Sequence, residues 1–153
     1  MARINAGISN LGNDSLNQGE PMGLAQGAVL PKDGALAFSM VATGAIVAGD
    51  AVTQDFATGV LQVTKVAADD SVARFGIALS TAAAGQDVWV AVMGFAQAVA
   101  GAAIAAGAAI ATSANAAGRI KTAAAAGGRT NLGWAVTAGA GAASVMSVFL
   151  DKS

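Results

Sequence analysis

The side chains that most often perform chemistry in proteins are scarce in this sequence of 153 residues. It has no histidine, no cysteine and no tyrosine. Without histidine there is no Ser-His-Asp triad and no imidazole base near pH 7. Without cysteine there is no zinc finger, iron–sulfur cluster or disulfide framework. We therefore expect a protein that is not an enzyme, with no catalytic residues, no cofactor and no metal site.

The remaining candidates for chemistry are isolated carboxylates and one glycine-rich segment. Asp50, Asp55 and Asp87 are single residues at predicted turns, and a catalytic pair among them stays open as an alternative. The dipeptide Asp69-Asp70 lacks the alternating oxygen ligands of a calcium loop. The segment 139–144 lacks the third small residue and the strand-to-helix setting of a dinucleotide site. No small-molecule substrate is expected.

Few charged residues are available for electrostatic recognition. Lys and Arg number 8 and Asp and Glu 9, which is 11% of the chain, against about 25% in an ordinary soluble domain. The basic residues form no stripe, so no nucleic-acid partner is expected. A net charge of −1 favours association with a partner over a free monomer.

One long uncharged segment raises the question of a membrane. No charged residue occurs from Val88 to Gly118, but glycines and Gln97 interrupt the segment, and its many alanines are only weakly hydrophobic. The N-terminal residues lack the apolar run of a secretory signal. We expect no membrane partner and keep a membrane-associated or pore-forming β protein as the alternative function.

The first 35 residues have the composition of an extended arm. Asparagine and glycine recur in this segment with two prolines, and no helical or strand period is present. We predict that residues 1–35 form an N-terminal arm that docks on a neighbouring subunit. The residues expected to make the contact are Arg3, Asn5, Asn10, Leu11, Asn13, Leu16, Asn17 and Met22.

Residues 36–153 are predicted to form one domain with an internal repeat, 45–92 and 103–149. The spacing between equivalent residues varies from 57 to 59, which indicates small insertions in the loops. The equivalent pairs are Ile46 and Ile104, Gly49 and Gly107, Val52 and Ile110, Gly59 and Gly118, Leu61 and Ile120, Gly76 and Gly133, Ala78 and Ala135, Leu79 and Val136, and Val88 and Val145.

Each half has the pattern of strands separated by glycine turns. Residues 60–66 alternate apolar and polar side chains, and Val88–Val92 is apolar on both faces. We predict a mainly β fold, a small glycine-rich β-sandwich or barrel with at most one short helix, for which the alanine-rich stretches are the candidates. Trp89 and Trp134 are expected to be core or interface aromatics. The predicted turn glycines are Gly49, Gly59, Gly76, Gly85, Gly107, Gly118 and Gly133.

A series of short glycine-centred blocks runs through residues 45–149. The block from Phe75 to Val90 is followed by Gly94, a turn at Ile104–Gly107, the tripeptide Gly118-Arg-Ile, and the closing strand that begins Gly133-Trp-Ala. This order resembles the capsid decoration (cement) proteins of tailed bacteriophages. Ala108 departs from the pattern, because it stands where Asp50 stands in the first half.

The resemblance implies a structural protein of the virion. Such a protein is made in the host cytoplasm, lies on the outer capsid surface, and binds the major capsid protein and itself, as a homotrimer. It stabilises the shell because it binds the assembled subunits. An adhesion module on the virion surface is a further alternative.

Overall fold

The computed structural model describes residues 29–32, 34–57, 61–69, 74–124 and 131–151. Within these residues the chain forms strands and turns, with no helix, so the predicted mainly β fold is confirmed. The strands are β1 (Val29–Lys32), β2 (Ala35–Ala42), β3 (Ala51–Gln54), β4 (Gln62–Lys65), β5 (Arg74–Ala78), β6 (Asp87–Val99), β7 (Ala109–Ser113), β8 (Arg119–Thr122), β9 (Gly133–Ala135) and β10 (Val145–Leu150).

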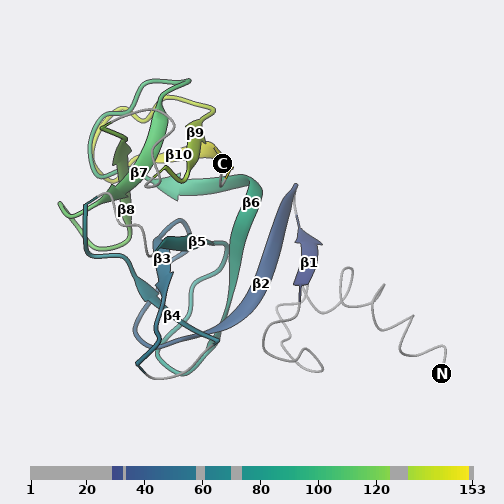
Figure 1. The fold of residues 1–153 in the computed structure, drawn as a ribbon. Coiled ribbons are helices and arrows are strands. Elements are labelled where there is room, and N and C mark those ends of the chain that lie inside the picture. Colours follow the sequence, from purple (N-terminus) through teal and green to yellow (C-terminus); the bar gives the residue numbers. More distant parts are fainter. Residues whose placement is uncertain (1–28, 33, 58–60, 70–73, 125–130, 152–153) are drawn as a thin grey trace.

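Hydrogen bonding arranges these strands in two rings that share β6 (Figure 1). The first ring has the order β2-β4-β3-β5-β6, and the pairing of β2 with β6 closes it. The second ring has the order β6-β10-β9-β7-β8, and a parallel bridge between Ala100, directly after β6, and Ile120 in β8 closes it. Strand β6 has 13 residues, enough for its first part to pair in the first ring and its second part in the second.

The two rings repeat the same backbone hydrogen bonds. Ile46 and Ala82 exchange two bonds of 2.9 Å in the first ring, and Ile104 and Gly139 exchange two of the same length in the second. The strand registers then match β3 with β7, β4 with β8 and β5 with β9. They also match β2 with the second part of β6, and the first part of β6 with β10.

One equivalence from the sequence is shifted by two residues in the structure. Gln54 pairs with Val63 across β3 and β4, and Thr112 pairs with Ile120 across β7 and β8. Ile120 therefore corresponds to Val63, and its assignment to Leu61 is wrong. The physical reason is the length of the β3–β4 connection: eight residues separate Gln54 from Val63, and seven separate Thr112 from Ile120. The first ring is therefore longer here by one residue, whereas a match of Leu61 with Ile120 would require it to be shorter by one.

A second equivalence is shifted by one residue. Met40 is opposite Val88 and, in the other ring, Ala98 is opposite Met146. Val88 therefore corresponds to Met146, and the predicted match with Val145 is wrong. Val88 and Met146 are both buried, whereas Val145 is 65% exposed. A shift of one residue in a strand moves the side chain to the opposite face, so only the register separates the two alignments.

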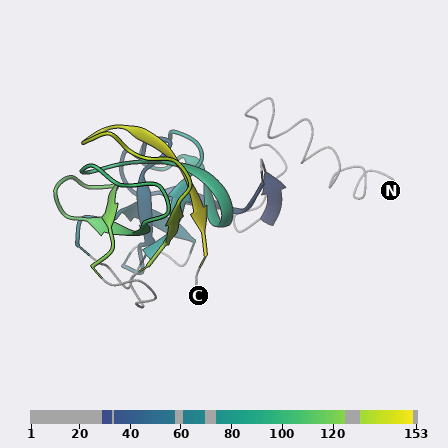
Figure 2. The same ribbon diagram turned by 90° about the horizontal axis from the view of Figure 1, so that it is seen from above.

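Part of the predicted arm is a strand of the sheet. Val29–Lys32 forms β1, which pairs antiparallel with β2 on the outside of the first ring (Figures 1 and 2). The expectation that no strand occurs in residues 1–35 is wrong, because a turn at Gly34, with φ 82°, folds this segment back on β2. The eight predicted contact residues, from Arg3 to Met22, lie outside the described residues.

The second ring packs directly on the first. Buried side chains form two clusters, and one of them is confined to the first ring. The other belongs mainly to the second ring but also contains Ala35, Ala51, Val66, Ile77 and Ala91 of the first. These five side chains thus pack with the second ring, and four of them are no larger than valine, which allows the rings to approach closely.

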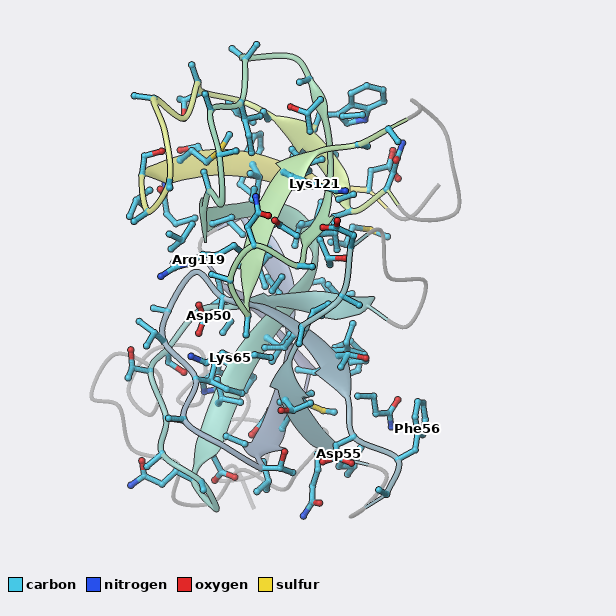
Figure 3. All side chains as sticks on the ribbon, turned by 90° about the vertical axis from the view of Figure 1, so that its left-hand side faces the viewer. Asp50, Asp55, Phe56, Lys65, Arg119 and Lys121 are labelled. Carbon is cyan, nitrogen blue, oxygen red and sulfur yellow. The ribbon has the colours of Figure 1, made fainter. Side chains whose placement is uncertain are left out.

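Asp50 lies where the two rings meet (Figure 3). It is 2% exposed, its Oδ2 accepts the Val47 N–H at 2.8 Å, and the same oxygen is 3.4 Å from Lys65 Nζ. Gly118 of the second ring lies against this carboxylate with φ 80°, and a Cβ there would fall 2.7 Å from the Asp50 Cγ. Both the backbone conformation and the space therefore require glycine at the junction.

Asp69 connects the segment after β4 to the second ring. Its Oδ1 accepts the Ala114 N–H at 2.6 Å and lies 3.4 Å from Lys121 Nζ. The hydrogen bond from Ala114 is the main cause that lowers the pKa of the Asp69 carboxyl. Desolvation opposes this effect, and the hydrogen bond and charge of Lys121 lower the pKa by smaller amounts. Beside it, the Thr112 hydroxyl donates to the Ala68 carbonyl at 2.8 Å.

The two rings differ in the residue that occupies one left-handed turn position. Gly85, between β5 and β6, has φ 82° and donates its N–H to the Ala42 carbonyl at 2.7 Å. Its counterpart between β9 and β10 is Ala143, with φ 65°, which donates to the Ala100 carbonyl at 2.8 Å. The left-handed conformation costs an L-residue about 1–2 kcal/mol.

Ala143→Gly should therefore raise the free energy of unfolding by roughly 0.5–1 kcal/mol, because the relief of left-handed strain exceeds the entropy that glycine adds to the unfolded chain. Denaturant titration measures the difference. Ala142→Gly is the matched control, since its φ is not positive, and it should be neutral or destabilising. A variant at 143 that is no more stable than the wild type would contradict this account.

The lowered pKa of Asp69 predicts a loss of stability in acid. Stability from a carboxyl with a depressed folded-state pKa is present above the unfolded pKa and is lost as the pH falls through the folded pKa. Wild type should melt higher than Asp69→Asn at about pH 6, and the difference should vanish near about pH 2. Lys121→Gln should reduce the difference, since Ala114 alone then lowers the pKa. If the difference in melting temperature does not depend on pH, the Asp69 carboxylate does not stabilise the fold through its contacts with Ala114 and Lys121.

Candidate functional site

Four large apolar side chains are exposed on β6, β10 and β9. We call Met93, Phe95, Phe149 and Trp134 the apolar stripe, and they are 51%, 53%, 36% and 41% exposed. Met93 lies where β6 still pairs with β2 of the first ring, opposite Leu36, and the other three belong to the second ring. Phe149 is opposite Phe95 across β6 and β10 and opposite Trp134 across β10 and β9. The rings of Phe95 and Phe149 pack edge to face with centroids 5.1 Å apart. Phe95, Phe149 and Trp134 therefore form a continuous aromatic surface across three strands.

Strand alternation places Phe95 and Phe149 on the outer face. In β6 the exposed residues Phe95 and Gln97 alternate with the buried Ala96 and Ala98, whereas Gly94, with φ 92°, separates Met93 from this part of the strand. The same alternation continues in β10, where residues 145, 147 and 149 face outward and 146, 148 and 150 face the core. The sequence analysis did not single out Met93, Phe95 or Phe149, although this alternation was the signal that could have found them.

A hollow of about 530 Å³ borders the stripe at Phe95. Ala48 and Gly49 of the first ring line it on one side, and Gln97, Val145 and Ser147 of the second ring on the other. The Gln97 Nε2 donates to the Ser147 Oγ at 2.8 Å, so the two polar groups in the lining satisfy each other. The hollow thus has room for a side chain and offers it mostly apolar contacts.

No charged side chain interrupts this surface. The strands β9 and β10, and β6 after Asp87, contain no Asp, Glu, Lys or Arg. Removing such apolar area from water is favourable by about 25 cal/mol per Å². Exposed aromatic surface of this kind marks sites where proteins bind other surfaces. The arrangement can therefore support binding to another surface.

The predicted turn glycines occupy two kinds of position. Inside β5 and β9, Gly76 and Gly133 are not at turns as predicted. A Cβ on Gly76 would collide with the Ala91 carbonyl oxygen, and one on Gly133 with that of Phe149, so glycine is needed there for close strand approach. Gly59 lies outside the described residues. The glycines found at turns, with φ between 79° and 93°, are Gly49, Gly85, Gly107 and Gly118.

The two tryptophans have different surroundings. Trp134 belongs to the apolar stripe, whereas Trp89 is half-buried in β6 opposite Ser39 of β2. Their positions are not equivalent in the repeat, since Trp134 corresponds to Ile77.

Three of the carboxylates that the structure describes are engaged locally. Asp50 faces Lys65, Asp69 faces Lys121, and the Asp55 Oδ1 accepts a hydrogen bond from a backbone N–H at 3.0 Å. In the described ranges, no group of three or more Asp or Glu side chains is placed to hold a metal ion. A separate search of the same ranges for a helix that is long and apolar enough to cross a membrane finds none.

Comparison with known proteins identifies a shared fold. No protein-family model matches the chain, and no curated protein sequence matches it. Among solved structures, the N base of the head fiber gp8.5 of bacteriophage phi29 is similar, with a TM-score of 0.60 and 18% sequence identity. The match covers 76% of this chain and 94% of that chain. The predicted membership of the decoration-protein family stays a prediction.

If the stripe dominates the apolar surface, Met93→Thr should shorten retention on a hydrophobic interaction column, because it interrupts a continuous patch. The free energy of unfolding should change by no more than about 1–2 kcal/mol, since the side chain is half exposed. Val47→Thr is the matched control, because Val47 is 50% exposed but lies off the stripe. Equal effects of the two substitutions would show that the stripe does not act as one surface.

Proposed function

We propose that this chain is a structural protein of a bacteriophage head, which binds the outer surface of the capsid shell and stabilises contacts between major capsid subunits. The observation that carries the proposal is the uncharged apolar stripe, on a fold that resembles the base of a phage head fiber. A protein of this kind needs contact surfaces and no reacting groups. We accordingly propose no catalytic role, no cofactor and no small-molecule substrate.

Modest contacts are sufficient for this role. A protein that binds the assembled shell and not the free subunits lowers the free energy of the shell by mass action. On a symmetric particle the same contact is repeated many times, so a small free energy per copy becomes large for the whole.

Two regions of the chain would make the contacts. The arm, with the eight residues from Arg3 to Met22 named above, would bind the major capsid protein. The apolar stripe and the hollow beside it would bind another protein surface. Self-association, as the homotrimer that the resemblance implies, is part of the proposal.

Deletion of residues 1–28 should weaken binding to capsids by at least about tenfold, since it removes the proposed contact residues. It should leave the folded domain intact, because the strands begin at Val29. Co-sedimentation with heads of the encoding phage, prepared without this chain, measures the binding, and thermal unfolding checks the fold. Replacing Asn5, Asn10, Asn13 and Asn17 with alanine keeps the length of the arm and should weaken binding less.

Three outcomes would change the proposal in different ways. A full chain that does not sediment with heads and is missing from purified particles would overturn the head role. A deleted chain that binds at full occupancy would remove the arm from the account. Flotation of the chain with liposomes would favour the membrane-associated alternative, whereas the proposal expects it to stay in the soluble fraction.

A further inference from the structure

The internal repeat shows how a surface equivalent to the apolar stripe becomes covered. The counterparts of the four stripe residues in the first ring are at most 5% exposed. Three of them, Ala35, Ile77 and Ala91, belong to the core cluster of the second ring. The same positions of the repeat are thus buried in the first ring, whereas in the stripe they are exposed and carry larger side chains. In the order Met93, Phe95, Phe149, Trp134, the counterparts are Ala35, Ala37, Ala91 and Ile77.

The end of the second ring that rests on the first includes the turn between β7 and β8, and it contacts Ala51, which is opposite Ile77 in the sheet. Gly118 in this turn donates its N–H to the Val66 carbonyl and accepts the Ala51 N–H, both at 2.7 Å. At the start of the same turn, the Ala114 N–H binds the Asp69 carboxylate. The β7–β8 turn of the second ring therefore rests on the first ring.

The counterpart of this turn in the first ring is the turn between β3 and β4, and it presents a large apolar side chain to solvent. Phe56, which corresponds to Ala114, is 74% exposed, more than the other large apolar residues that the structure describes. Asp55 holds the turn: its Oδ1 accepts the Ala57 N–H at 3.0 Å, and its own N–H donates to the Gln62 carbonyl at 2.8 Å. Figure 3 shows Phe56 at the end of the molecule that lies away from Asp50 and the second ring.

The stripe and the β3–β4 turn of one molecule cannot meet. Strand β3 leads away from the junction at Asp50, and its four residues carry the chain roughly 13 Å before the turn begins. Strands β10 and β9, which carry Phe149 and Trp134, lie at the end of the molecule away from β4 in Figure 1, and β6 runs between the two ends. A turn of this kind can therefore cover a stripe only in another molecule.

We propose that the first ring of a second copy of this chain covers the apolar stripe, with the turn that carries Phe56 docked against it. The contact repeats between copies the packing of ring on ring that exists within one chain. It is heterologous, because each copy contributes the β3–β4 turn on one side and the stripe on the other. The inference gives the self-association in the proposed function a defined contact, and it does not depend on binding to a capsid.

Apolar burial would supply most of the stability of this contact. A stable interface buries about 800 Å² on each partner, and its centre is depleted of charged residues. The stripe supplies such an uncharged centre, and the hollow beside Phe95 accepts further apolar side chains from the partner. A charge placed on either side would be desolvated without a partner, so it should prevent the contact.

A pair of complementary variants tests the proposal. Phe56→Asp disables the turn and keeps the stripe, and Phe95→Asp disables the stripe and keeps the turn. Each variant alone should self-associate at least about tenfold more weakly than the wild type in analytical ultracentrifugation. An equimolar mixture should form a one-to-one heterodimer with an affinity near that of wild type, since one intact turn then meets one intact stripe.

Controls separate this contact from unfolding and from binding to heads. Val47→Asp, half exposed and off the stripe, should associate as wild type does. Met93→Lys and Phe56→Ser repeat the test in case Phe95→Asp perturbs the fold, which denaturant titration reveals. A wild type that stays monomeric at all concentrations, or a mixture that does not recover association, overturns the proposal. Co-sedimentation with heads is measured separately, so a chain that associates as expected but binds no heads overturns only the proposed function.

Discussion

Strand β6 holds the two halves of the molecule together because it is a member of both rings. Its first part closes the first ring against β2, and its second part opens the second ring against β10. The strand turns from one ring to the other at Gly94, where φ is 92° and a Cβ would collide with the Gly34 carbonyl oxygen. The rings therefore cannot separate without breaking the ladder of a shared strand. The contacts of Asp50 and Asp69 across the junction add to the connection that the shared strand already makes.

The small side chains that dominate the composition have a role in this packing. Alanine and glycine together supply 61 of the 153 residues, 41 and 20 respectively. Rings of five strands leave little space inside, and the junction between the rings is closer still, with Ala51 and Ala91 facing the second ring and Gly118 against Asp50. Larger residues at these positions would force the rings apart. The same composition leaves few charged residues for the surface, which explains how an uncharged outer face can arise in a folded chain.

The two halves share one backbone plan, and their differences mark where the molecule contacts its surroundings. Where the first ring has Ala91, which belongs to the core cluster of the second ring, the second ring has Phe149 facing outward. A large aromatic side chain exposes more apolar area than alanine, so the free energy of leaving this face in water is higher. A protein with this surface and with its carboxylates engaged in local hydrogen bonds and ion pairs is suited to assembly.

The amino-acid pattern determined the chemistry and the class of fold. The missing histidine and cysteine remove most catalytic and metal sites, and the alternating segments with glycine turns predict strands, because side chains in a strand alternate between faces. The repeat was visible too, but one of its matches failed by one residue, at Val88, and that error exchanges the buried face for the exposed one. Tertiary structure alone decided which face is covered. Alternation shows that Phe95 and Gln97 share a face, yet the equivalent face of the first ring is buried, and only the packing of ring on ring distinguishes the two.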